Sequence, residues 1–124
     1  MEYWVTGAED SWESASVLMH SNHNSMAAFC FHLSIEKFLK AIWIKNNQSN
    51  TPPRIHNLIY LHDGAKLNLE DESKDFLKII NTWNQEGRYQ EYINKLHKAI
   101  SKEFLENRMN DLINLKKCLQ EKVQ

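Results

Sequence analysis

Ionisable side chains recur every four residues along one stretch of the chain, at His32, Glu36 and Lys40. In an α-helix this spacing stacks the side chains on one face. Their neighbours are almost entirely apolar, and an unpaired buried charge costs several kcal/mol, so these groups must be paired. Two interpretations follow: the three side chains hold a neighbouring helix at the edge of the fold, or they line a polar pocket.

Two other regions carry groups that suit a polar site. Arg88 could supply a positive partner for Glu36, because a guanidinium makes a two-point contact with a carboxylate. His56 follows a proline-containing loop, where a histidine is either a hydrogen-bonding residue at a helix start or a ligand. We expect Arg88 to lie close to Glu36 or Lys40 and to the ring of Tyr89, lining one concavity with His56.

Several other kinds of site have no support in the sequence. Three widely spaced glycines leave no phosphate-binding loop. His20 and His23 could share a helix face, but no carboxylate or cysteine completes a metal site there. Cys30 and Cys118 lack metal spacing and lie within apolar helical patterns, as buried reduced thiols do. We therefore expect neither a metal nor a cofactor.

The segments that must position these residues have helical patterns. The stretch from 25 to about 47 is apolar on nearly every side, which is typical of a buried central helix. Polar residues and two prolines at 46–53 end it. The segment before it carries apolar residues on one helical face, spaced four, four, three and four apart: Trp4, Ala8, Trp12, Ala15 and Met19.

The second half of the chain continues in the same way. A short helix should turn Leu58 and Leu61 inward, and the acidic run 70–72 should open the next. The stretch 89–100 is compatible with a helix or a wrapped loop, and a last helix begins near Ser101. With few breakers and no boundary, residues 1–124 form a single all-α domain, an antiparallel up-and-down bundle of four to five helices.

Charge and composition bound the location and partners. Residues 1–36 contain no Lys or Arg, whereas 88–124 contain eight, which indicates either complementary helices or a basic surface for phosphate. No stretch reaches ~18 apolar residues and the N-terminus lacks a basic signal region, so we expect a cytoplasmic protein without membrane contact. Four tryptophans are many for so small a core and favour a two-fold homodimer.

Three motifs, in order, resemble those of the HEPN domain family. They are EKFLKA at 36–41, HNLIYL at 56–61 and GRY at 87–89, and the resemblance covers about residues 4–122. It implies a helical bundle, often a homodimer, commonly encoded beside a minimal nucleotidyltransferase; some members are RNA-cleaving toxins. The residues we place in a nucleotide- or phosphate-binding site are Glu36, Lys37, Lys40, His56, Arg88 and Tyr89.

The sequence departs from the RNA-cleaving members of that family. Those members carry an Arg followed four to six residues later by a His, whereas here His97 stands nine positions after Arg88. We therefore favour a non-enzymatic module that binds a nucleotide or partners a nucleotidyltransferase subunit, in a setting related to toxin–antitoxin systems. The alternatives are an RNA-cleaving toxin that uses a rearranged Arg88/His97 pair, and a purely structural helical interaction protein.

Overall fold

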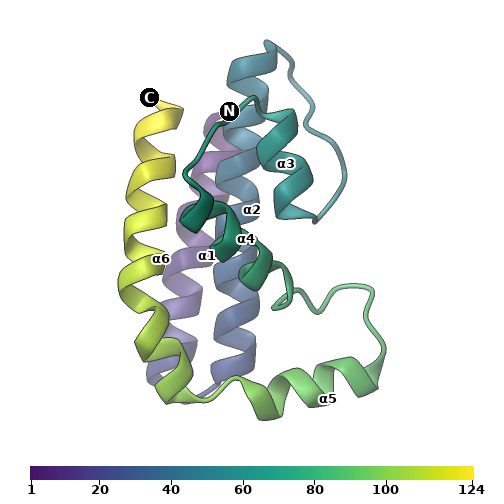
Figure 1. The fold of residues 1–124 in the computed structure, drawn as a ribbon, viewed down its shortest axis with the longest axis vertical. Coiled ribbons are helices and arrows are strands. Elements are labelled where there is room, and N and C mark those ends of the chain that lie inside the picture. Colours follow the sequence, from purple (N-terminus) through teal and green to yellow (C-terminus); the bar gives the residue numbers. More distant parts are fainter.

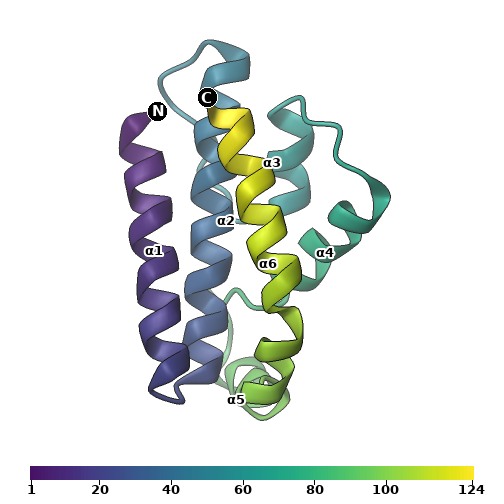
Figure 2. The ribbon, with the colours of Figure 1, turned by 90° about the vertical axis from the view of Figure 1, so that its left-hand side faces the viewer.

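The computed structural model describes residues 1–124, and its regular elements are all helices. In chain order they are α1 (Glu2–His20), α2 (Asn24–Asn47), α3 (Leu58–Gly64), α4 (Asp71–Asn81), α5 (Gln90–Ala99) and α6 (Lys102–Val123). The long helices α1, α2 and α6 lie side by side, and α5 crosses one end of them (Figure 1; Figure 2). The predicted all-α bundle is confirmed, with six helices where four to five were expected.

The three long helices do not simply alternate in direction. α1 runs antiparallel to α2, but α6 runs parallel to α2, and both chain ends lie at one end of the bundle (Figure 2). Lys45, in the last turn of α2, donates to the carbonyl oxygen of Lys122 at 3.1 Å and also to that of Gln124. Between α2 and α6, helix α4 runs back toward the other end of the bundle, so α1, α2, α4 and α6 follow the expected up-and-down order and α3 and α5 are additional helices (Figure 1; Figure 2).

Helix α2 is the centre of the bundle, as its sequence predicted. It packs against all five other helices. Burial of each large apolar side chain contributes about 1.5–3 kcal/mol relative to exposure, which makes α2 the main source of core energy. The fully buried large side chains that α2 contributes are Phe31, Ile35, Phe38, Leu39 and Ile42.

Small side chains let α1 approach α2 closely. The buried residues of α1 are Ala8, Ser11 and Ala15, three and four positions apart on one face. Ser34 Oγ of α2 donates to the carbonyl oxygen of Ala8 at 2.7 Å. Trp12 lies beside this contact and meets Phe31 edge-on, with ring centroids 4.9 Å apart.

Local caps set several helix ends. Ser101 Oγ accepts from the Phe104 N–H at 3.0 Å and starts α6, close to the predicted boundary. Gln48 ends α2 in a left-handed conformation (φ 51°). The stretch 89–100, left open by the sequence, is the helix α5 over Gln90–Ala99.

An aromatic cluster fixes the segment that follows α4. Trp83 is 1% exposed and meets Phe76 of α4 and Phe104 of α6 edge-on, with centroids 6.2 Å away in each case. Such contacts add about 0.5–1.5 kcal/mol beyond burial of the rings. They anchor the chain immediately before the predicted Gly87–Tyr89 turn.

None of the six helices combines the length and apolar character that a membrane crossing requires.

Candidate functional site

Glu36 is the centre of a buried polar cluster on α2. The residue is 4% exposed, and its Oε2 accepts from Lys40 Nζ at 3.1 Å. Its Oε1 accepts from His56 Nδ1 at 2.9 Å and lies 3.9 Å from His32 Nδ1. Lys40, itself 6% exposed, also lies over the ring of Trp4 at 5.2 Å. The sequence-predicted stripe is thus one paired network, in which each charge has a partner close by.

The loop before α3 brings His56 to this network. Asn57, the next residue, is the N-cap of α3, and its Oδ1 accepts from the backbone N–H of Ile59 and Tyr60. The backbone oxygen of His56 accepts from His32 Nε2 at 3.2 Å. His56 is therefore not the helix-start residue; Asn57 is, and His56 uses both its backbone and its ring to hold the loop on α2.

Glu86 also belongs to this cluster, although the sequence did not single it out. Its Oε2 lies 3.3 Å from His56 Nε2, on the opposite side of the ring from Glu36. A charged imidazole can donate to both carboxylates, whereas a neutral one can donate to only one of them. Glu86 stands one residue before Gly87, so the ring of His56 connects α2 with the turn that carries Arg88.

Lys37 points to another part of the surface. Its Nζ donates to Ser11 Oγ of α1 at 2.9 Å. It lines a hollow of about 470 Å³ on that side, together with Trp4 and exposed Tyr3. Lys37 and Lys40 are three positions apart, yet only Lys40 joins the Glu36 network, so the predicted binding residues do not form a single pocket.

Arg88 and Tyr89 lie in an exposed turn. Gly87 has a φ of +73°, which glycine adopts readily, and it leads into Arg88. The Arg88 guanidinium lies over the ring of Tyr92 at 4.7 Å, and Tyr89 is 89% exposed. The predicted ion pair between Arg88 and Glu36 is absent, because Lys40 and His56 already occupy that carboxylate, and the predicted contact with the Tyr89 ring is replaced by Tyr92.

A family comparison covers nearly the whole chain. The family profile described as HEPN domain matches residues 1–122. The chain belongs to the HEPN domain family. A search of curated proteins and a search of solved structures each return no match. The motif resemblance in the sequence is thereby confirmed.

The arrangement of this HEPN domain separates the two residues considered for RNA cleavage. His97 lies on α5, and its Nδ1 is 3.0 Å from Ser25 Oγ at the start of α2. Arg88 precedes the first residue of the same helix. From Gln90 to His97 the helix rises about 10 Å at 1.5 Å per residue, and Arg88 lies outside α5, two residues before Gln90.

No three His, Cys, Asp or Glu side chains of the domain converge in a way that could hold a metal ion. His20 Nδ1 is directed to the backbone oxygen of Ser16 at 2.7 Å rather than toward His23. Cys30 and Cys118 are free and half-buried. The polar contacts at the centre of the candidate site are those that Glu36 makes with Lys40 and with His56.

His32 is a fully buried histidine in the middle of this network. Its Nδ1 has no hydrogen-bond partner, while Nε2 donates to the His56 carbonyl. Burial lowers the pKa of His32 below its ordinary value of 6.5, and this outweighs the opposing attraction of Glu36. Between the lowered pKa and 6.5, the unfolded chain binds a proton at this position that the folded chain does not.

We expect the stability of the domain to fall as the pH drops below about 6.5 through the lowered pKa of His32, with a slope of at most ~1.4 kcal/mol per pH unit. His32→Gln keeps an N–H donor but removes the titrating group. The stability of this variant should therefore fall less than that of the wild type as the pH drops below about 6.5. Urea unfolding across the window measures the difference, with His20→Gln, an exposed histidine, as the control. Equal slopes for wild type and His32→Gln would contradict the assignment.

Proposed function

We propose that this HEPN domain is a non-catalytic module that binds a nucleotide, with a phosphate of the ligand held by Arg88. The observation that carries the proposal is the state of that side chain. Arg88 is exposed, makes no ion pair and is held over the ring of Tyr92 at 4.7 Å. Stacking on an aromatic face fixes the plane of a guanidinium and leaves its N–H groups free for two-point contact with phosphate.

The start of α5 adds to this cation. Tyr89 is the N-cap of α5 and provides no side-chain cap, so the N–H groups of Gln90 and Glu91 have no hydrogen-bond partner within the chain, whereas those of Tyr92 and Ile93 donate to the Tyr89 carbonyl oxygen. Such N–H groups and the positive end of the helix dipole favour an anion. The ring of Tyr89, 89% exposed, offers a face on which a base can stack.

The buried cluster has a supporting part in this proposal. Glu36 and Lys40 satisfy each other and are almost inaccessible, so neither is available to an incoming phosphate. His56 joins Glu36 to Glu86, two residues before Arg88. The network therefore holds the base of the turn in place, and the ligand is bound by the exposed residues that follow.

Titration calorimetry of the purified domain tests the proposal. We expect at least one of a panel of ribonucleoside mono- and triphosphates to bind, and inorganic phosphate to bind more weakly at the same site. A panel without any binding, with the fold confirmed by circular dichroism, would contradict a nucleotide-binding role.

The same protein is expected not to cleave RNA. Acid–base cleavage needs a histidine within hydrogen-bond reach of the reacting oxygens and a cation on the phosphate. His97 lies in the second half of α5 and Arg88 precedes that helix, so we expect the two not to act together within one chain. A two-fold dimer could bring Arg88 of one chain to His97 of the other. The test is incubation of the wild type and of an Arg88→Ala/His97→Ala control with single-stranded RNA and with transfer RNA. It distinguishes a protein that does not cleave RNA from one that cleaves it as a dimer. Cleavage by the wild type alone would establish the toxin alternative.

A further inference from the structure

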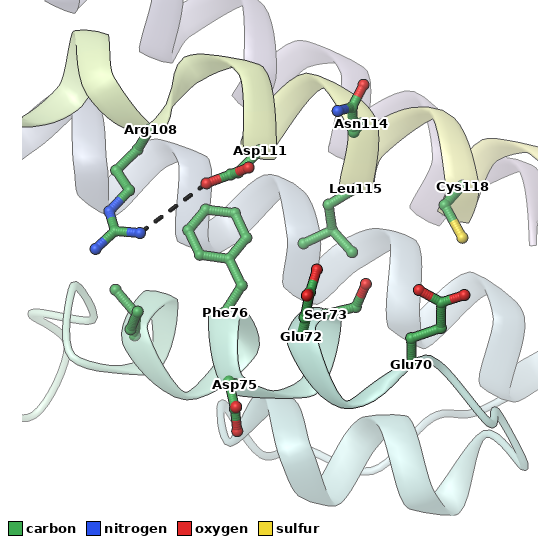
Figure 3. Close-up of a pocket in the computed structure, with 11 residues that line it drawn as sticks. Glu70, Glu72, Ser73, Asp75, Phe76, Arg108, Asp111, Asn114, Leu115 and Cys118 are labelled. Atoms are coloured by element: carbon green, nitrogen blue, oxygen red, sulfur yellow. Dashed lines mark ion pairs between the residues drawn. The ribbon is translucent and has the colours of Figure 1, made fainter.

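A groove runs between α4 and α6, on a part of the surface that is separate from the Arg88 turn. It has a volume of about 520 Å³ (Figure 3). Its floor is formed by Phe76 of α4 and Leu115 of α6, which face each other and are 7% and 5% exposed. Because α4 packs against α2 and α3, this side of α6 is left open along the groove.

The walls of the groove are acidic. Of the four carboxylates in its lining, Asp75 points away from α6 (Figure 3) and lies 3.7 Å from Lys78 Nζ, so the carboxylates on the groove side are Glu70, Glu72 and Asp111, with Arg108 as the one cation of the lining. Glu70 and Glu72 make no ion pair and point toward α6 (Figure 3). A negative patch repels nucleic acid and attracts a basic ligand.

The two ends of the groove differ. At one end Arg108 lies over the rings of Phe76 and Phe104, 5.9 and 5.6 Å from their centroids, and its Nη1 is 4.0 Å from Asp111 Oδ2. The carboxylate at that end thus has a cation of its own. At the other end Glu70 and Glu72 have none, so a positive group is missing only there.

The length of the groove sets the size of its ligand. On α6 the lining residues Arg108, Asp111, Leu115 and Cys118 are three or four positions apart, on one face over three turns. At 1.5 Å per residue this face is about 15 Å long, the length of a ten-residue helix. An apolar floor between acidic walls matches a helix with one apolar stripe and flanking basic residues.

We propose that the α4–α6 groove is the docking site for a short basic amphipathic helix of a partner protein. Apolar side chains of that helix cover Phe76 and Leu115, and a Lys or Arg at one of its ends pairs with Glu70 and Glu72. This partner site is independent of nucleotide binding at Arg88, so either can fail without the other.

The probe is a synthetic amphipathic peptide of about twelve residues, long enough to fill the groove, in which a leucine and alanine stripe is flanked by lysine and arginine. Titrated into the ¹⁵N-labelled domain, it should shift amide resonances along α4 and the facing side of α6. Glu70→Gln/Glu72→Gln should weaken binding about tenfold, because the basic residue at that end of the peptide loses both of its carboxylate partners. The matched control Glu9→Gln/Glu13→Gln removes the same charge from exposed positions of α1 and should change affinity less than about twofold.

Three outcomes would overturn the proposal: no binding of the peptide, equal weakening by the two double variants, or equal binding of a peptide with glutamate in place of its basic residues. Resonance shifts centred on the hollow lined by Tyr3, Trp4 and Lys37 would also overturn the proposal. Circular dichroism of the Glu70→Gln/Glu72→Gln variant tests for a folding defect, which is not expected because both residues are exposed at the start of α4.

Discussion

Replacing Glu36 with leucine is expected to lower the free energy of unfolding by about 3–5 kcal/mol, because it leaves the Lys40 ammonium buried without a carboxylate. Lys40 is 6% exposed, and its other close neighbour is the ring of Trp4. The change also removes the acceptor of His56 Nδ1, which holds the loop before α3. With total stabilities of about 5–15 kcal/mol for domains in general, the variant should lie near the limit of folding.

The double variant Glu36→Leu/Lys40→Met should recover most of that loss. Removing both partners leaves no unpaired buried charge, and apolar replacement of a buried ion pair is often neutral. Urea unfolding followed by circular dichroism gives the free energies of unfolding, provided that the m-values of the variants equal that of the wild type. The coupling between the two changes is the difference between the double variant and the sum of the singles.

An exposed ion pair is the matched control. Asp75 and Lys78 lie 3.7 Å apart on α4 with most of both side chains in solvent. Asp75→Leu should therefore change stability by less than about 1 kcal/mol. A loss of similar size at Glu36 would mean that water reaches the cluster and that the network does not hold the loop.

The sequence predicted the centre of the fold well, because the pattern on α2 is local. A helix with apolar residues on all sides can only be stable when other helices surround it. The positions of Phe31, Phe38 and Ile42, each 0% exposed, confirm this. The start of a helix could also be predicted where a side chain supplies the N-cap, as Ser101 does for α6.

The course of the chain between α4 and α6 could not be predicted in the same way. Helix α5 buries only Leu96, so its apolar pattern does not fix its direction. Its position depends on contacts between residues far apart in sequence, such as Gln85 Nε2 donating to the Ser25 backbone oxygen and His97 meeting Ser25 Oγ. The parallel course of α2 and α6 follows from this same stretch.

The ion-pair partner of Glu36 was open to prediction from helix geometry alone. Glu followed four residues later by Lys is the favoured orientation of a helical ion pair, and it needs no loop to close. The Glu36–Lys40 contact at 3.1 Å therefore forms in preference to one with Arg88, fifty-two residues away. Glu86 has no comparable signal, since nothing in its spacing relates it to His56.

The second large effect is expected at Arg88. Arg88→Ala should abolish nucleotide binding while leaving the free energy of unfolding within about 0.5 kcal/mol of wild type, because it is an exposed side chain outside the core. Its guanidinium is stacked on Tyr92 and makes no ion pair, so its removal leaves no buried charge behind. Calorimetric titration with the nucleotide that binds the wild type best measures the loss.

Two further variants separate geometry from charge. Arg88→Lys keeps the positive charge but loses the planar two-point contact, so binding should weaken and not disappear. Arg54→Ala removes an exposed arginine from the loop before His56 and should leave binding unchanged. If affinity falls with Arg54→Ala and persists in Arg88→Ala, the phosphate is bound at the loop before α3. The contact of Arg88 with the ring of Tyr92 would then only hold the start of α5 against the turn that precedes it, and Arg88 would not bind phosphate.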